Sequence, residues 1–345
     1  MYRNRTWRAV IGKAATVGVV LALALSGCAD KPQAASTSKP ADKVTYLTGF
    51  QTTPREGYGF VAKGAGLFSA AGIDVNVQAG NPSDANLKLL AAGQAQFASV
   101  DFVSAVRGAK TYPGLRVVMA VQQTTLLSII TMPGRGITED DPASLIGKTI
   151  GTAPAAASQT LFPRYANLAK FDGSKVKFAN FQPNDLPGLM VSGKIDAMGA
   201  YAIDTPGIKA TAHGVDPVVL PISKYITDLY GTVIVTTTKL IHDNPDLVRR
   251  FVGAMWKGIQ YAVNHTDGDG KDPRNAGALL HQAVPADDAG IMRDTMKLMK
   301  NYATSPQLEP GRVARGIALL ETAQMADSGL QPDQVVDFSF AKTAA

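Results

Sequence analysis

Residues 57–75, GYGFVAKGAGLFSAAGIDV, hold the pattern that decides the fold. Apolar residues recur at helical spacing over the first part, and this pattern ends at Gly66-Leu67-Phe68. A short apolar run suited to a strand follows at 73–77. The segment therefore predicts a helix–turn–strand unit, which is the building block of sheets whose strands are connected by helices.

Outward from this unit, short apolar runs alternate with helical patterns. Many runs lack polar alternation, which is typical of parallel strands buried on both faces. The predicted strands are residues 44–48, 73–77, 97–100, 116–121, 126–132, 148–151, 176–181, 195–199, 218–221 and 231–236. The predicted helices between them lie near 58–71, 83–92, 102–110, 157–169, 184–192 and 205–213. This alternation predicts an α/β architecture.

The last third of the chain has a helical pattern instead. Asn244-Pro245-Asp246 supplies an N-cap, a proline at the first helical position and an acidic first turn. Further helices are predicted near 287–302 and 311–326. We expect this C-terminal set to wrap one lobe of the protein.

Five segments, taken in order, resemble a family of bacterial solute-binding proteins. They are GYGFVAKGAGLFSAAGIDV at 57–75, LKLLAAGQAQFASVD at 87–101, SLIGKTIGT at 144–152, LMVSGKIDAMGAY at 189–201 and NPDLVRRF at 244–251. Members of that family serve importers for thiamine pyrimidine precursors, aliphatic sulfonates, nitrate and related solutes. The resemblance covers residues 43–264 and rests on the order and spacing of the segments.

The resemblance implies the two-lobed α/β fold of type II periplasmic binding proteins, in which a hinge closes two lobes around a solute. Lobe one would comprise 43–128 plus 235–345, and lobe two 133–230. Two crossing stretches, near 127–133 and 231–237, would form the hinge. The importer's permease subunits would be separate chains.

The N-terminus predicts export and lipidation. Four basic residues precede an apolar run at 14–25, which is too short to span a bilayer but suits a signal peptide. Leu25-Ser26-Gly27-Cys28 then resembles the lipobox of bacterial lipoproteins, with Cys28 as the lipidated residue. A plain secretory signal with an incidental cysteine is the alternative. Because Cys28 is the only cysteine of the chain, lipidation accounts for an otherwise unpaired thiol in an exported protein.

Cleavage before Cys28 would remove residues 1–27 and with them four basic and no acidic residues. The formal net charge would then fall from +6 to +2, so the basic character gives no reason to expect a nucleic-acid partner. Residues 28–42 read as a flexible tether, since they offer no apolar face to bury.

Candidate ligand-binding residues lie where predicted strands end, because ligands of open α/β sheets bind beyond the carboxyl ends of the strands. In lobe one these residues are Phe50, Gln51, Thr52, Arg55, Tyr58, Asp101 and Phe102. An ordinary polar loop is the alternative for the first five. Asp101 is equally suited to cap the helix that follows it.

In lobe two the candidates are Ser158, Gln159, Thr160, Tyr201 and Asp204, and Tyr230 opens the returning hinge strand. Residues 158–160 stand near a helix N-terminus, which favours negative atoms, although Ser158 would also serve as a cap. The tyrosines are suited to sandwich a flat ring, or else simply to fill the core with paired hydroxyls.

The mix of Asp101, Asp204 and aromatic residues favours a neutral or amine-bearing heterocycle, such as an aminopyrimidine precursor of thiamine. Arg55 is the main basic candidate, and backbone amides offer an alternative means of holding an oxyanion. A sulfonate, nitrate or bicarbonate ligand therefore remains the second prediction.

Two enzyme interpretations compete with binding. Gly57, Gly59 and Ala62 satisfy G-x-G-x-x-G/A, but the predicted strand ends too early for the tight turn of a dinucleotide site. A fungal relative of the family makes thiamine pyrimidine with a histidine and a cysteine-rich motif, whereas this chain has one cysteine. Its four histidines are widely spaced, without the patterning of metal ligands or a catalytic triad.

We therefore predict an extracytoplasmic, membrane-anchored binder with no catalytic residues, no metal and no cofactor. Its partners would be a small-molecule solute and the permease subunits of an ABC importer, with the protein itself a monomer. A sensor lipoprotein that signals to a partner is a further alternative.

Overall fold

The computed structural model describes residues 40–49, 52–154, 156–268, 272–285 and 288–340. The predicted signal peptide, Cys28 and most of the tether lie outside the described residues, as do Phe50 and Gln51. Among the helices that are described, none is both long enough and apolar enough to cross a bilayer.

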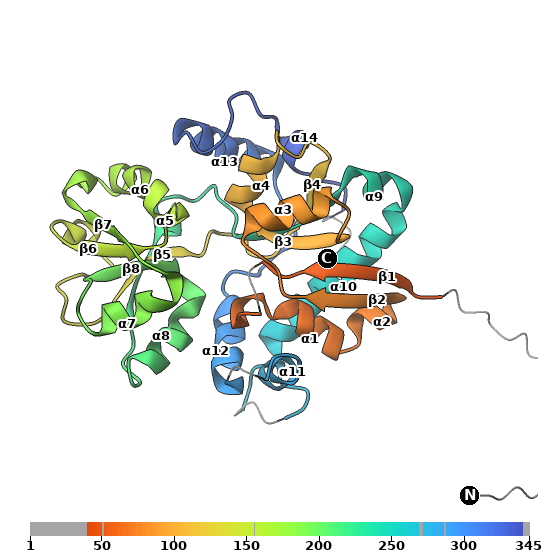
Figure 1. Cartoon of the computed structure of the whole chain (residues 1–345), viewed down its shortest axis with the longest axis horizontal. Helices are drawn as coiled ribbons and strands as arrows, with labels where there is room; N and C mark the ends of the chain where they lie inside the picture. Colours follow the sequence, from red (N-terminus) through yellow and green to blue (C-terminus); the bar gives the residue numbers. More distant parts are fainter. Residues whose placement is uncertain (1–39, 50–51, 155, 269–271, 286–287, 341–345) are drawn as a thin grey trace, which may run out of the picture. The chain divides into compact units, whose positions relative to one another are not determined.

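The first sheet has the strand order β2-β1-β3-β10-β4. Its strands are β1 (Asp42–Leu47), β2 (Ile73–Gln78), β3 (Phe97–Asp101), β4 (Leu115–Ala120) and β10 (Thr232–Thr237). Strand β1 pairs in parallel with β2 and β3, whereas β10 runs antiparallel to β3 and β4. We call this sheet and the helices packed on it the first lobe (Figure 1).

The second sheet has the order β7-β6-β8-β5-β9. Its strands are β5 (Leu127–Thr131), β6 (Thr149–Thr152), β7 (Lys177–Asn180), β8 (Ala197–Tyr201) and β9 (Val218–Pro221). Strand β6 pairs in parallel with β7 and β8, and β5 runs antiparallel to β8 and β9. This sheet and its helices form the second lobe. Each of the ten predicted strands overlaps one observed strand.

The chain passes between the sheets twice, and the strands that follow each passage run antiparallel to their neighbours. The first passage lies between β4 and β5, so the strand at 127–131 already belongs to the second sheet. The second passage ends where β10 starts at Thr232. The structure thus differs from the expected first crossing at 127–133, because the apolar residues there pair within the second sheet.

The helices are α1 (Tyr58–Gly64), α2 (Leu67–Ala70), α3 (Ser83–Ala91), α4 (Phe102–Gly108), α5 (Ala157–Thr160), α6 (Phe162–Leu168), α7 (Leu186–Val191), α8 (Thr205–Thr211), α9 (Thr238–Asp243), α10 (Pro245–Asn264), α11 (Ala276–Ala283), α12 (Ala289–Met299), α13 (Pro310–Thr322) and α14 (Pro332–Val335). The helix predicted near 58–71 is divided into α1 and α2, because Gly66 has a φ of 73°.

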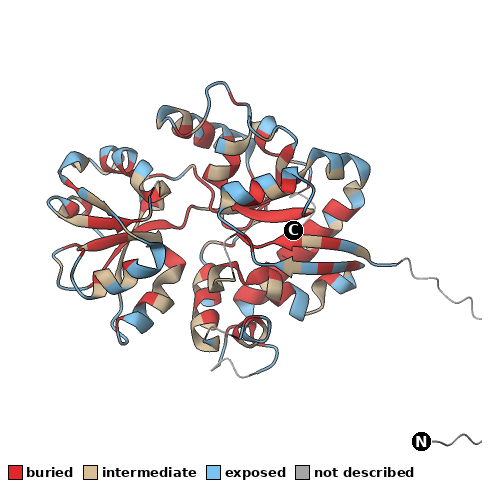
Figure 2. Cartoon of the chain, in the orientation of Figure 1, coloured by how far each residue is buried: buried red, intermediate tan, exposed pale blue. Residues whose placement is uncertain are grey.

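The core of the first lobe is built around Phe251 of α10. Its ring stacks on Phe97 of β3, with 3.7 Å between the ring centroids, and also contacts Tyr46 and Phe68. Asn244 caps α10 as predicted, because its side-chain oxygen accepts a hydrogen bond from the Leu247 amide at 3.1 Å. Figure 2 shows that buried residues follow the strands of both sheets and the helix faces turned towards them.

Helix α12 departs from the prediction that the C-terminal helices wrap one lobe. It packs against α10, α11 and the 3-10 turn η1 (Pro54–Glu56) of the first lobe. It also contacts α8 and the 3-10 turn η5 (Ala202–Asp204), which follow β8 of the second lobe. This position lets α12 contribute to the wall of the site described next.

Candidate functional site

A cavity of about 640 Å³ lies where the carboxyl ends of parallel strands from both sheets face each other. Segments that follow β1 and β3 line it from the first lobe, and segments that follow β6, β7 and β8 line it from the second. Such a position beyond strand ends is where open α/β sheets bind their ligands. The volume is that of a small-molecule site.

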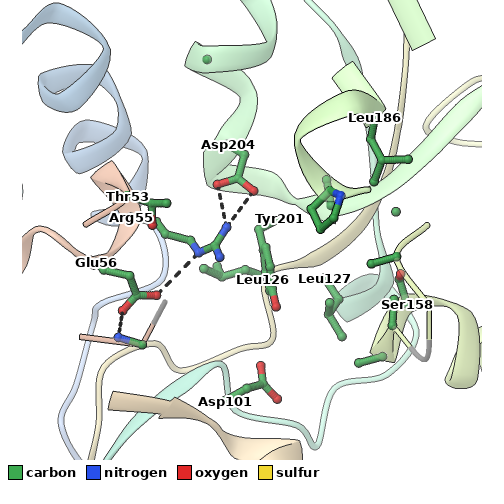
Figure 3. A pocket seen from close by; sticks show the side chains of 18 of the residues that line it. Thr53, Arg55, Glu56, Asp101, Leu126, Leu127, Ser158, Leu186, Tyr201 and Asp204 are labelled. Carbon is green, nitrogen blue, oxygen red and sulfur yellow. Dashed lines mark hydrogen bonds and ion pairs between the residues drawn. The ribbon is translucent and has the colours of Figure 1, made fainter. Parts of the chain in front are cut away.

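The first-lobe wall carries most of the charge. Arg55 and Glu56 come from η1, and Asp101 comes from the last residue of β3 (Figure 3). Ser83 at the start of α3 and Thr232 at the start of β10 add hydroxyl groups.

The second-lobe wall is mostly small and apolar, with four polar side chains. They are those of Ser158, Asn184, Tyr201 and Asp204. Its apolar members include Leu127, Ala153, Ala157, Leu186, Met198 and Ile208. The small side chains of Ala153, Ala156 and Ala157 leave room for a ligand close to the backbone.

Arg55 joins the two walls. Its Nη1 lies 3.1 Å from Asp204 Oδ2 and 3.3 Å from Oδ1, and its guanidinium carbon lies 4.4 Å from the centroid of the Tyr201 ring. Burial acts to lower the pKa of the guanidinium, but the attraction of Asp204, Tyr201 and Glu56 outweighs burial and raises that pKa. Arg55 is therefore always charged, and its charge is already matched by a carboxylate.

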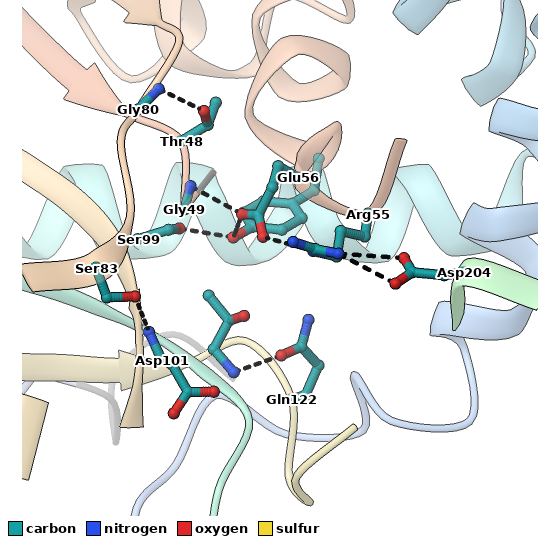
Figure 4. A network of polar contacts seen from close by, with 12 residues as sticks. Thr48, Gly49, Arg55, Glu56, Gly80, Ser83, Ser99, Asp101, Gln122 and Asp204 are labelled. Atoms are coloured by element: carbon teal, nitrogen blue, oxygen red, sulfur yellow. Dashed lines mark hydrogen bonds and ion pairs between the residues drawn. The ribbon is translucent and has the colours of Figure 1, made fainter. Parts of the chain in front are cut away.

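Glu56 is buried, with 4 % of its surface exposed. Its Oε2 accepts hydrogen bonds from the Gly49 amide at 2.9 Å and from the Tyr58 hydroxyl at 3.3 Å, and its Oε1 lies 3.5 Å from Arg55 Nε. Burial raises the pKa of this carboxyl above its ordinary value, against the opposing effects of Arg55 and Gly49. Figure 4 shows this chain of contacts.

Asp101 differs from Glu56 in the partners of its carboxylate. Its Oδ1 accepts a hydrogen bond from the Val103 amide at 2.9 Å, which makes it the N-cap of α4. Burial raises the pKa of the Asp101 carboxyl to about 6, and the backbone hydrogen bonds only partly offset this effect. Within the described part of the chain, Asp101 has no ion-pair partner, and its carboxylate faces the cavity (Figure 3).

The structure brings five of the predicted ligand-binding residues together on the cavity wall. They are Arg55, Asp101, Ser158, Tyr201 and Asp204. Burial raises the pKa of the Tyr201 hydroxyl, so this group stays protonated near neutral pH.

Three predicted residues lie in the core instead of on the cavity wall. Tyr58, Phe102 and Tyr230 are fully buried. The Tyr58 hydroxyl pairs with Ser99 Oγ at 2.6 Å, and the hydroxyl of Tyr230 accepts a hydrogen bond from the Glu309 amide at 2.9 Å. Phe102 packs edge-on against Tyr230, with centroids 5.4 Å apart. At these three positions the aromatic residues fill the core, as the alternative interpretation predicted.

Thr52, Gln159 and Thr160 are also absent from the described cavity wall. Gln159 accepts a hydrogen bond from the Thr152 hydroxyl at 3.1 Å, and Thr160 donates one to the Ala156 carbonyl at 3.2 Å. Both side chains are thereby turned to local partners at the start of the α5–α6 segment.

Several wall residues were not predicted from the sequence. Glu56 and Ser83 lie in segments that follow predicted strands, so the rule that placed Asp101 could have found them. Thr232 starts β10, so a rule on carboxyl ends of strands does not select it. Ile291 and Thr295 come from α12, more than 50 residues after the last strand. No local pattern assigns that helix to the cavity.

The described residues include no group of three or more His, Cys, Asp or Glu side chains placed to hold a metal ion. No histidine is among the described residues that line the cavity. The groups that line it are carboxylates, the Arg55 guanidinium, the Asn184 amide, hydroxyls, an aromatic ring and apolar side chains.

Comparison with known families decides the classification. Residues 57–268 match the model of the family described as NMT1/THI5 like. The chain belongs to this family. The match confirms the resemblance drawn from the five sequence segments.

Solved structures share the fold at low sequence identity. The periplasmic aliphatic sulphonate binding protein SsuA of Escherichia coli is 13% identical, with a TM-score of 0.68, covering 87% of this chain and 92% of that one. The alkanesulfonate-binding protein SsuA of Xanthomonas axonopodis pv. citri, bound to MOPS, is 12% identical, with a TM-score of 0.62 and coverages of 90% and 99%. The desulfurization enzyme DszB is 15% identical, with a TM-score of 0.57 and coverages of 88% and 99%.

These likenesses confirm the predicted fold class, the two-lobed α/β fold of type II periplasmic binding proteins. No curated protein matches the sequence.

Proposed function

We propose that this chain is the solute-binding lipoprotein of an ABC importer. It captures a small amine-bearing heterocycle outside the cytoplasmic membrane, and a thiamine-precursor pyrimidine is the leading candidate. The lipobox around Cys28 supports the location and the anchor, and the family and fold support solute binding by two lobes.

The observation that carries the ligand class is the charge balance of the cavity. Three carboxylates line it, from Glu56, Asp101 and Asp204, whereas Arg55 is the one basic residue among its described wall residues. Arg55 is already bound to Asp204. An oxyanion would face unbalanced carboxylates, while a ligand with N–H donors or a positive charge would pair with Asp101.

The apolar part of the wall supports a flat ring. Leu127, Leu186 and Met198 offer apolar surface from the second lobe, and Tyr201 offers an aromatic ring at the same side. A cavity with apolar walls and a few polar groups is the usual form of a site for a small heterocycle.

A sulfonate is the second candidate. Two structural relatives are named for sulfonate binding, and the first turn of α5 presents backbone N–H groups near Ser158 on the wall. Asp101 disfavours this candidate, because its carboxylate would lie in the same cavity as the negatively charged sulfonate oxygens.

Catalysis is the third possibility that the relatives raise, since one of them is named as a desulfurization enzyme. The sole cysteine, Cys28, belongs to the predicted lipobox, and no histidine is among the described wall residues. We therefore propose a binder that releases its solute unchanged to the permease subunits. The alternative of a sensor differs only in the partner that receives the closed form.

A thermal-shift screen tests the proposal. A solute that binds only the folded state raises the unfolding temperature by mass action. The screen contains aminopyrimidines, flavin-like compounds, alkanesulfonates, nitrate and bicarbonate. We expect a shift with an aminopyrimidine. A shift with a sulfonate alone would overturn the ligand class, and recovery of a chemically altered compound would overturn the assignment as a binder.

A further inference from the structure

Arg55 contacts both lobes with one side chain. It belongs to η1 of the first lobe, yet its Nη1 binds the carboxylate of Asp204 at 3.1 and 3.3 Å. Its guanidinium carbon also lies over the ring of Tyr201, 4.4 Å from the ring centroid, which is close enough for a cation–π interaction. Tyr201 ends β8 and Asp204 ends η5, so both partners belong to the second lobe.

The base of this contact is fixed in the first lobe. Arg55 Nε lies 3.5 Å from Glu56 Oε1, and Glu56 is held by the Gly49 amide and the Tyr58 hydroxyl. The Tyr58 hydroxyl in turn pairs with Ser99 Oγ at 2.6 Å, and Ser99 with the Tyr46 hydroxyl at 2.6 Å. A line of polar contacts therefore runs from the core of the first lobe to the second lobe (Figure 4).

The fit around Glu56 is close. A Cβ atom on Gly49 would lie 2.6 Å from Glu56 Oε2, so a larger residue there would force the Glu56 carboxylate to shift. The side chains of Arg55, Glu56 and Asp204 are 18%, 5% and 31% exposed. Partial exclusion of water strengthens a charged pair relative to one on the open surface.

We propose that Arg55 is an interlobe latch. Bound to Asp204 and Tyr201, it stabilises the closed arrangement of the lobes before any solute arrives, and Glu56 is the residue that positions it. The latch sets the population of the closed form, whereas Asp101 and the apolar wall face the solute. This inference concerns the protein alone and does not depend on the identity of the solute.

The test measures the distance between the lobes in the absence of solute. Two spin labels are introduced through Lys88→Cys on α3 and Lys177→Cys on β7, both exposed positions, in a chain that carries Cys28→Ser. Pulsed electron paramagnetic resonance then gives the distribution of label distances. We expect one narrow distribution for the chain with Asp204 intact.

Asp204→Asn should shift the closed-to-open ratio about tenfold towards the open form, because it removes the charged partner of Arg55. Asp204→Glu should restore the narrow distribution. The matched control is Asp84→Asn, which breaks the Arg107–Asp84 pair of 2.6 Å within the first lobe and should leave the distribution unchanged. An unchanged distribution in Asp204→Asn would overturn the latch.

Arg55→Lys gives a second variant that keeps the positive charge but loses the planar stacking and the paired donors. We expect it to open the lobes as well, with circular dichroism as the check that both variants are folded. If Arg55→Lys instead keeps the narrow distribution, the proposed latch is wrong.

The positioning role of Glu56 is tested by a double-mutant cycle. Glu56→Gln should open the lobes less than Asp204→Asn, and the double variant should open no further than Asp204→Asn alone, since both act on Arg55. Additive effects would remove Glu56 from the latch. A failed solute screen would leave all of these distances unaffected, so the two proposals fail separately.

Discussion

Asp101 and Asp204 line the same cavity from opposite lobes, but their surroundings differ. Asp204 is bound to the guanidinium of Arg55, whereas Asp101 is held by the backbone amide of Val103. Asp101 is the last residue of β3, and Asp204 ends the turn that follows β8. The same side chain near two strand ends can therefore either bind a residue of the other lobe or face the solute. The difference lies in which residue the neighbouring element presents to it.

The largest expected effect comes from Asp101→Asn. Asparagine also caps helices, so α4 should keep its N-terminus, but the charge facing the solute is lost. Hydrogen bonds to charged groups are worth about 1.5–3 kcal/mol, which corresponds to about a 10- to 100-fold loss of affinity. Isothermal titration with the solute from the screen measures this loss. Equal affinity in Asp101→Asn and in the exposed control Asp84→Asn would show that Asp101 does not contact the solute.

The packing of the second-lobe wall, which carries Asp204, can be changed without altering a charged residue. An added methyl group at Gly199 of β8 would lie 2.4 Å from Ser158 Oγ and 3.0 Å from Thr152 Cγ2. We expect Gly199→Ala to lower the free energy of unfolding by about 1–3 kcal/mol, as overpacking does.

Gly207 of α8 provides the matched control, because it lines the same cavity but has open space at its Cβ position. Gly207→Ala should be neutral or should stabilise the protein by about 0.5–1 kcal/mol, since alanine is the better helix former. Urea denaturation measures both variants. Equal loss of stability in the two would contradict the close packing at Gly199.

The pH dependence of the affinity for the solute further distinguishes Asp101 from Asp204. The pKa of Asp101 is raised to about 6, so its charged form is lost as the pH falls below that value. A cationic or N–H-donating solute should therefore bind more weakly as the pH falls below 6, by up to about tenfold per pH unit, until the total loss reaches the one expected for Asp101→Asn. This slope should vanish in Asp101→Asn. Affinity that increases on acidification would favour an anionic solute.

The smallest expected effect is on stability. Because the folded-state pKa of Asp101 lies above its ordinary value of 3.8, the folded protein binds more protons than the unfolded chain between about pH 4 and 6. The contribution of Asp101 to the free energy of unfolding therefore falls as the pH rises through this window.

Asp101→Asn should remove this contribution. Relative to the unsubstituted protein, the variant should therefore be more stable at pH 7 than at pH 4, by an amount on the order of 1 kcal/mol. Urea denaturation of both proteins at pH 4 and pH 7 gives the difference. The difference between the two proteins isolates Asp101 from Glu56, whose pKa is also raised. The same difference at both pH values would contradict the raised pKa.

The strands were predictable because burial on both faces leaves a local mark. Runs such as 97–100 and 126–132 are mostly apolar and lack polar alternation, and each overlaps an observed strand. The cap and proline at Asn244 and Pro245 likewise fixed the start of α10. These features depend on a few neighbouring residues, so the sequence displays them directly.

The cavity wall was only partly predictable. Arg55, Asp101 and Asp204 stand at strand or loop ends and were found by that rule. The same rule also selected Tyr58 and Tyr230, which are buried with their hydroxyls paired. Position along a strand says which end a side chain is near, but not whether the next element covers it.

The sequence by itself determined the α/β alternation, the family and the candidate strand ends. Only the tertiary structure decided which of those residues share a cavity, that Glu56 is buried beneath Arg55, and that Arg55 reaches Asp204 in the other lobe. The physical reason is the distance along the sequence over which each effect acts. Backbone propensity and hydrophobic periodicity act over a few residues, whereas a pairing such as Arg55 with Asp204 joins positions 149 residues apart that only packing brings together.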